Sequence, residues 1–160
     1  MKWNGGLMNK SLAFAVLFLL VSMLCFGQKA PDPKGIEDLV NRAAALVESK
    51  GKAAFDEFRK KDSEWFYGNT YVFVDDMNGK SLCLPSNPAE EGKTNLDLKD
   101  ASGKQVMKDF IDTAKKGSGW IEYVWPKPGE TKPSKKKSFV RSTKMPDGQM
   151  VIVGSGMYVE

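Results

Sequence analysis

The chain has 160 residues, a formal net charge of +4 and no histidine. This length suggests one domain with a substantial core, and 41% hydrophobic with 28% charged residues is typical of a folded chain. The lack of histidine excludes catalytic sites of the Ser-His-Asp and Cys-His kinds, and the modest charge gives no reason to expect a nucleic-acid partner.

Residues 1–27 are predicted to be a signal peptide. Two lysines precede an apolar run over residues 12–26, and cleavage after Gly27 would leave residues 28–160 as a single exported domain, periplasmic or secreted. The run is shorter than the roughly 20 residues that a membrane-spanning helix needs, so cleavage is favoured over an uncleaved anchor. Lipidation of Cys25 is a third interpretation.

The first helix of the mature chain is predicted to begin at Asp32-Pro33, because aspartate caps helices and proline fits their first turn. Apolar residues then recur at spacings of three and four, which is typical of one buried helix face. They are Ile36, Leu39, Val40, Ala43 and Val47. We expect one long helix, kinked near Gly51 and ending around Lys61.

A β-hairpin is expected after a loop over residues 62–69. Strands at 70–75 and 80–84 flank Asn78-Gly79, the strongest short-range hairpin signal. In the first strand, Tyr71 and Phe73 point to one face and two valines point to the other. The alternation does not decide which face carries the long helix.

A second helix should follow a proline-rich loop over residues 85–92. Ser102 and Gln105 match a capping box, and Gly117 is a natural stop. Cys83 is the only cysteine of the mature chain, so no internal disulfide can form, and we expect its thiol to be buried on a strand.

Three strands close the chain. An aromatic strand at 120–125 precedes strands at 136–144 and from 150, and Gly154 and Gly156 can hold a bulge or allow close backbone approach. The order predicts an α+β domain with five mainly antiparallel strands, a long N-terminal helix across one face and a shorter helix. The second helix and the loop after Leu84 can then enclose a cavity on the other face.

Several segments resemble the Cache family in its single, type 2 form. In chain order they are Tyr71-Val-Phe-Val-Asp-Asp-Met-Asn-Gly79, Leu82-Cys-Leu-Pro85, Asn87-Pro88, Gly92-Lys93, Gly119-Trp-Ile-Glu-Tyr-Val-Trp-Pro126, Lys137-Ser-Phe-Val140 and Val153-Gly-Ser-Gly-Met-Tyr158. The resemblance implies a PAS-like sheet in an extracytoplasmic sensor module of chemoreceptors or sensor kinases. It also implies a pocket on the sheet that binds small molecules, often short carboxylates.

The chain departs from the family pattern in two ways. It ends at Glu160 with no second membrane segment or signalling region, so we expect a free-standing domain without signalling output of its own. Family members often carry a histidine just before the loop proline, where this chain has Leu84, and this difference leaves the ligand class open.

Five residues are expected to converge on one ligand cavity. They are Tyr71, Phe73, Trp120, Tyr123 and Lys137. The rings would supply apolar walls and Tyr123 a hydroxyl, although core packing is the alternative for each ring. Lys137 enters through the resemblance, as a partner for a carboxylate, and a solvated strand edge is its alternative.

The leading hypothesis is an exported Cache-type domain that binds a small ligand as a sensory accessory to a membrane receptor or sensor kinase. The alternatives are a structural or interaction protein with a vestigial pocket, and a histidine-free enzyme, which we do not expect. Asp75, Asp76 and Asp100 lack the spacing of a calcium loop. We therefore expect no metal and no cofactor.

Overall fold

The computed structural model describes residues 32–159, so the predicted signal peptide lies outside the described residues. Six strands form one antiparallel sheet, in the order β1-β2-β6-β5-β4 with β3 also paired to β2. The strands are β1 (Phe66–Tyr67), β2 (Thr70–Asp76), β3 (Ser81–Cys83), β4 (Ser118–Pro126), β5 (Pro133–Lys144) and β6 (Met150–Tyr158). The predicted α+β fold is confirmed. The short β1 adds a sixth strand where a loop was expected.

The long N-terminal helix is interrupted at the predicted glycine. Helix α2 (Pro33–Lys50) leads into a 3₁₀ turn over Gly51–Ala53 and then into α3 (Ala54–Phe58). Asp32 caps α2, since its Oδ1 accepts a hydrogen bond from the Gly35 N–H at 2.7 Å. Gly51 has a φ of 57°, which favours glycine and explains the kink.

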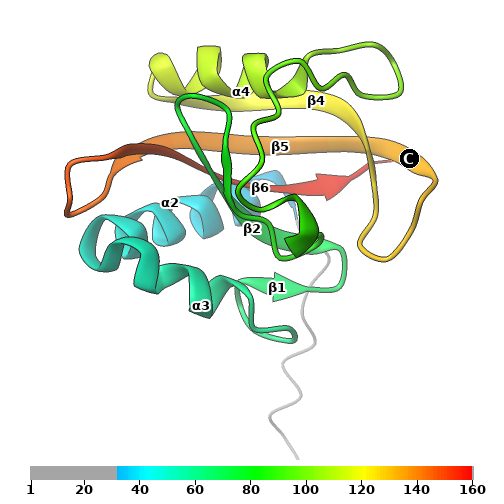
Figure 1. Cartoon of the computed structure of the whole chain (residues 1–160). Coiled ribbons are helices and arrows are strands. Elements are labelled where there is room, and N and C mark those ends of the chain that lie inside the picture. The colour runs from blue at the N-terminus through cyan, green and yellow to red at the C-terminus, as the bar shows by residue number, and fades with distance from the viewer. Residues whose placement is uncertain (1–31, 160) are drawn as a thin grey trace, which may run out of the picture. The chain divides into compact units, whose positions relative to one another are not determined.

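Helices cover both faces of the sheet, with α2 on one side and α4 (Val106–Lys115) on the other (Figure 1). The inward valines of β2 and β6 pack against α2; they are Val72, Val74, Val151 and Val153. Tyr71 and Phe73 therefore point towards α4. This resolves the alternative that the sequence left open. Within residues 32–159, no helix is long and apolar enough to cross a bilayer.

The segment before α4 is held by an aspartate rather than by a capping box. Gln105, at the N-cap, makes no side-chain cap, and the Ser102 hydroxyl donates to Asp100 instead, at 2.6 Å. The Asp100 carboxylate also accepts three backbone N–H groups, one of them from Val124 on β4. Burial raises the pKa of Asp100, but these hydrogen bonds outweigh it and lower the pKa to about 2. Asp100 thus ties this segment to β4.

Cys83 lies on β3 in the core beneath α2, with no exposed surface. Burial raises the pKa of its thiol to about 12. The expected buried position on a strand is confirmed.

The two glycines of β6 permit close approach and do not form a bulge. Strand β6 pairs continuously with β5, and the register shift of the sheet lies between Val74 and Asp75. A Cβ on Gly154 would lie 2.3 Å from the ring of Phe73. Only glycine leaves room for that ring, which is stacked on Phe110 with centroids 5.4 Å apart.

We expect Gly154→Ala to destabilise the domain by about 1–3 kcal/mol, because the added methyl group overpacks the core against Phe73. Thermal unfolding should show a drop of several degrees in melting temperature. In a Phe73→Leu background the same change should cost less, because leucine is smaller than the ring that the methyl group meets. Additive losses in the double variant would contradict this explanation.

Candidate functional site

A cavity of about 50 Å³ lies between the sheet and α4. Its lining comes from β2, β3, α4, β4 and the long segment between β3 and α4: Tyr71, Phe73, Asp75, Ser81, Leu84, Asn95, Leu98, Val106, Met107, Phe110, Tyr123 and Trp125. Most of these groups are apolar, and a few polar atoms are placed among them. This composition is typical of sites for small organic ligands.

A larger groove of about 640 Å³ adjoins the cavity. It runs between the proline loop after β3 and the loop that joins β4 to β5. Leu84, Leu98, Asn95 and Trp125 line both hollows. We call this hollow the approach groove, because it leads from the surface to the cavity.

Three of the five predicted site residues come together at the cavity. Tyr71, Phe73 and Tyr123 line it from β2 and β4. Phe110 of α4 connects two of them, since its ring stacks on Phe73 and meets Tyr123 edge-on at 5.5 Å. The rings form one continuous wall, and a ligand role for them is a proposal taken up below.

A buried lysine lies behind this aromatic wall. Lys136 of β5 is 1% exposed, and its Nζ donates a hydrogen bond to the Tyr71 hydroxyl at 2.8 Å. The same nitrogen lies 4.0 Å from the ring centre of Tyr71 and within 6.0 Å of those of Phe73 and Tyr123. The ammonium therefore sits among the three rings that line the cavity, and the ring faces attract it.

The Lys136 ammonium has unused hydrogen-bonding capacity. An ammonium carries three N–H donors, and the one hydrogen bond that it forms within residues 32–159 is the bond to Tyr71. No carboxylate of the described chain forms an ion pair with it. A buried cation without an anion is costly, so this position favours an anion from outside the chain.

The electrostatics of the tyrosines follow from this lysine. Burial raises the pKa of Tyr71, but the nearby Lys136 charge and its hydrogen bond outweigh burial and lower the pKa overall. Burial raises the pKa of both Tyr123 and Tyr158. Tyr71 lines the cavity and Lys136 lies behind it, hydrogen-bonded to the Tyr71 hydroxyl, and we call this pair the cationic end of the cavity.

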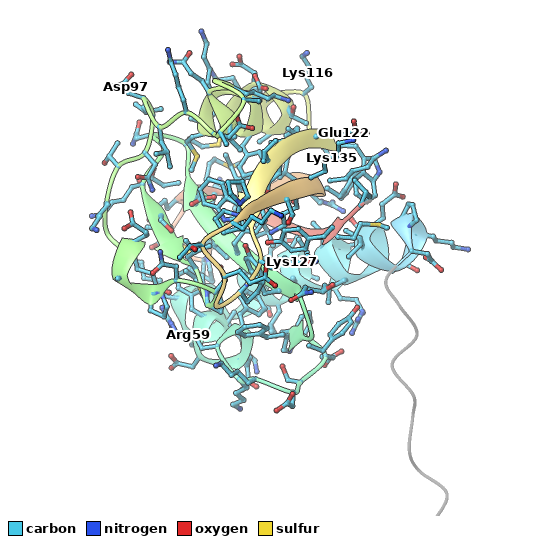
Figure 2. All side chains as sticks on the ribbon, turned by 90° about the vertical axis from the view of Figure 1, so that its right-hand side faces the viewer. Arg59, Asp97, Lys116, Glu122, Lys127 and Lys135 are labelled. Atoms are coloured by element: carbon cyan, nitrogen blue, oxygen red, sulfur yellow. The ribbon has the colours of Figure 1, made fainter. Side chains whose placement is uncertain are left out.

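Trp120 and Lys137 lie on the opposite face of the sheet, contrary to expectation. The indole N–H of Trp120 donates to Glu37 of α2 at 2.7 Å. Lys137 Nζ lies 3.4 Å from a carboxylate oxygen of Glu122 and 5.3 Å from the Trp120 ring centre. In Figure 2, Glu122 on β4 and Lys135 on β5 lie at the surface of the domain.

The physical reason is the alternation of side chains along a strand. Trp120 and Tyr123 are three positions apart, so they cannot share a face. Lys136 and Lys137 are adjacent, so only one of them can point to the cavity. The register pairs Lys136 with Tyr123 and Lys137 with Glu122, and it therefore assigns the buried position to Lys136.

A glutamate side chain helps to hold the proline loop in place. Glu91 accepts a hydrogen bond from the Leu84 N–H at 2.8 Å and pairs with Arg59, after the end of α3, at 2.7 Å. This pair connects the cavity-lining Leu84 with the end of α3. In the described part of the chain, no three acidic or cysteine side chains gather in a way that could hold a metal ion.

Comparison with known proteins gives consistent results. A family model described as a Cache domain matches residues 42–160. The sensor histidine kinase MctS of Rhizobium johnstonii is 37% identical over 90 residues, which are 56% of this chain and 19% of the kinase. The methyl-accepting chemotaxis protein McpP of Pseudomonas putida is 32% identical over 91 residues, which are 56% of this chain and 16% of that protein. The matched segment is thus less than a fifth of either relative.

Solved structures share the fold. One, described as "Structural basis for carboxylic acid recognition by a Cache chemosensory domain", has a TM-score of 0.68 and 29% identity, over 79% of this chain and 92% of that one. Another, described as the periplasmic sensor domain of a chemotaxis protein, has a TM-score of 0.62 and 32% identity, over 78% of this chain and 88% of that one.

Proposed function

The chain belongs to the Cache domain family, and from this premise we propose that its folded domain is an extracytoplasmic sensor that binds a short organic carboxylate. The ligand would occupy the cavity between the sheet and α4, with its carboxylate at the cationic end formed by Lys136 and Tyr71. A signalling protein of the sensor kinase or chemoreceptor type would respond to the occupied state. The names of the similar proteins support both parts of this proposal.

The observation that carries the proposal is the unpaired, buried ammonium of Lys136. A carboxylate beside it would accept a charge-assisted hydrogen bond from Nζ, and a second hydrogen bond from the Tyr71 hydroxyl. Both groups are already oriented by their mutual hydrogen bond at 2.8 Å. The site would therefore lose little conformational freedom when the anion binds.

The size of the cavity limits the ligand. A volume of about 50 Å³ is far below that of sites for drug-sized molecules, so the cavity suits a small ligand. Phe73, Phe110 and Met107 would contact that chain, and Leu84 would close the cavity from the proline loop. A leucine at this position makes the loop side apolar.

We expect short monocarboxylates to raise the melting temperature of the domain, and their neutral amides to do so far less. A ligand at 100 times its dissociation constant stabilises a protein by about 2.7 kcal/mol, which is several degrees for a domain of this size. A thermal-shift screen should pair acetate, propionate and butyrate with the corresponding amides, at equal ionic strength. A screen in which the amides stabilise as well as the acids would overturn the carboxylate assignment.

A further inference from the structure

The end of the cavity remote from Lys136 also carries polar groups, and they are of the opposite kind. Asp75 of β2 and Ser81 of β3 are direct partners across the two strands, where the register shifts. Both side chains line the cavity, and they are only 4% and 2% exposed. The amide of Asn95 lines the same space.

The Ser81 hydroxyl is a buried polar group without a partner. Its Oγ forms no hydrogen bond of ordinary geometry with any group in residues 32–159, although it lies near enough to Asp75 to lower the pKa of that carboxyl. A buried hydroxyl without a partner is uncommon in folded proteins and indicates a hydrogen-bonding partner from outside the described chain. The hydroxyl lies on the cavity wall, so a ligand is the natural partner.

Asp75 likewise lacks a cation. Its surroundings are Ser81, a second carboxylate at Asp76, the phenol of Tyr123 and the thiol of Cys83. Asp76 is engaged in the hairpin turn, where its Oδ1 accepts from two backbone N–H groups. The Asp75 carboxyl therefore lines the cavity without a cationic partner among residues 32–159, and the Ser81 hydroxyl is the neighbour that lowers its pKa.

The two polar ends are separated by an apolar middle. Tyr71, Phe73 and Asp75 alternate along β2 and all three line the cavity, so Tyr71 and Asp75 reach it from positions four residues apart on the strand. The Phe73 ring lies between them and stacks on Phe110. A ligand that contacts both ends must present unlike groups at the two ends of a short hydrocarbon chain.

We propose that Asp75 and Ser81 form a second polar contact in the site, which binds a hydrogen-bond donor at the end of the ligand remote from its carboxylate. The ligand class is then a short carboxylic acid with a distal hydroxyl or ammonium group. This inference rests on the proposed function, because it takes the carboxylate at Lys136 as its reference point.

The chemistry favours discrimination between a ligand with a donor and one without it. A ligand donor satisfies Asp75 as an acceptor. The Ser81 hydroxyl can then accept from a ligand ammonium, or donate to or accept from a ligand hydroxyl. An analogue without the donor leaves both buried groups unpaired, and a site built in this way rejects such an analogue.

The test is calorimetry with butyrate, 4-hydroxybutyrate and 4-aminobutyrate on the folded domain. We expect the wild type to bind one or both substituted acids roughly tenfold to a hundredfold more tightly than butyrate. Asp75→Asn and Ser81→Ala should reduce that ratio, because each removes one of the two groups that distinguish the substituted acids from butyrate. Asp38→Asn and Ser49→Ala are matched controls, because both positions are exposed on α2, and they should leave the ratio unchanged.

Each outcome separates the two proposals. Binding of all three acids with equal affinity would overturn the second contact and leave the carboxylate sensor standing. Failure of all three to bind would overturn both. A preference that survives in both Asp75→Asn and Ser81→Ala would assign the donor contact to other residues and refute this inference. Tighter binding than butyrate by 4-aminobutyrate alone would identify the donor as an ammonium. Tighter binding by 4-hydroxybutyrate alone would identify it as a hydroxyl.

Discussion

Lys136→Met should weaken carboxylate binding by roughly tenfold to a hundredfold, which corresponds to the loss of one charge-assisted hydrogen bond of about 1.5–3 kcal/mol. The change removes the ammonium and keeps an unbranched apolar side chain among the rings of Tyr71, Phe73 and Tyr123. Isothermal calorimetry with the best short carboxylate from the screen provides the measurement.

The fold should tolerate this substitution. Lys136 is buried without an anionic partner, so its replacement by an apolar side chain relieves a cost of burial. The Tyr71 hydroxyl keeps Ser86 and Tyr158 as neighbours. The melting temperature without ligand should therefore be equal to that of the wild type, or higher.

Lys137→Met is the matched control, because it removes the same charge from the next position on the strand. Lys137 pairs with Glu122 on the exposed side, and such surface pairs contribute little to stability. Its affinity for the ligand should equal that of the wild type. If Lys137→Met weakened binding as much as Lys136→Met, the effect would come from general electrostatics and the cationic end would not be the carboxylate site. Propionamide provides a second control, since its weak binding should not depend on Lys136.

The contrast between these two lysines shows what the sequence can and cannot predict. Alternation correctly placed Tyr71 and Phe73 on one face of β2 and the neighbouring valines on the other. The structure then shows that the valines pack on α2 and the rings face α4. On β5 the same alternation did not decide which set of side chains faces the cavity. Lys137 entered the predicted site through the family resemblance and not through alternation. It lies on the same face of β5 as Phe139, whose ring meets Trp120 on the α2 side, at 5.5 Å.

The missed residues share a physical explanation. Asp75 and Ser81 belong to a hairpin whose polar residues are usually assigned to the turn, and only the register across β2 and β3 shows that they face a cavity. The evidence for Lys136 is likewise structural. Lys136, Ser138 and Val140 lie on one face of β5 and are buried, whereas the two residues between them are half-exposed.

The capping box failed for a different reason, which is competition between local hydrogen bonds. Ser102 could have capped the helix, but its hydroxyl and N–H both bind Asp100, which also accepts the Val124 N–H from β4. A contact between distant segments overrode a short-range motif. The extra strand β1 is similar, because two residues pair with β2 only once the chain has folded back.

Asp75→Asn should stabilise the domain without ligand at about pH 8 and have little effect near pH 4. Burial raises the pKa of Asp75 from its ordinary value of 3.8 to about 7. Between those values the folded chain binds a proton that the unfolded chain has released. The free energy of unfolding of the wild type therefore falls as the pH rises from about 4 to about 7.

Above about pH 7 the folded protein holds an ionised carboxylate that is 4% exposed, beside a second carboxylate at Asp76 and with no cation next to it. A pKa displaced by about 3 units corresponds to a cost of up to about 4 kcal/mol, because each unit is worth about 1.4 kcal/mol. Asparagine keeps the shape and cannot ionise. The melting temperature of Asp75→Asn should exceed that of the wild type by up to about 10 °C at about pH 8.

The measurement is a series of thermal unfolding curves from about pH 4 to pH 8 for the wild type, Asp75→Asn and the exposed control Asp38→Asn. The wild type and Asp38→Asn should lose stability together as the pH rises, while Asp75→Asn should lose much less. Parallel curves for all three proteins would show that Asp75 does not titrate in this range. If 4-aminobutyrate binds at Asp75, saturating amounts should restore wild-type stability most strongly at about pH 8, where the ligand ammonium meets an ionised partner. The same ligand should stabilise Asp75→Asn by an amount that does not increase towards about pH 8.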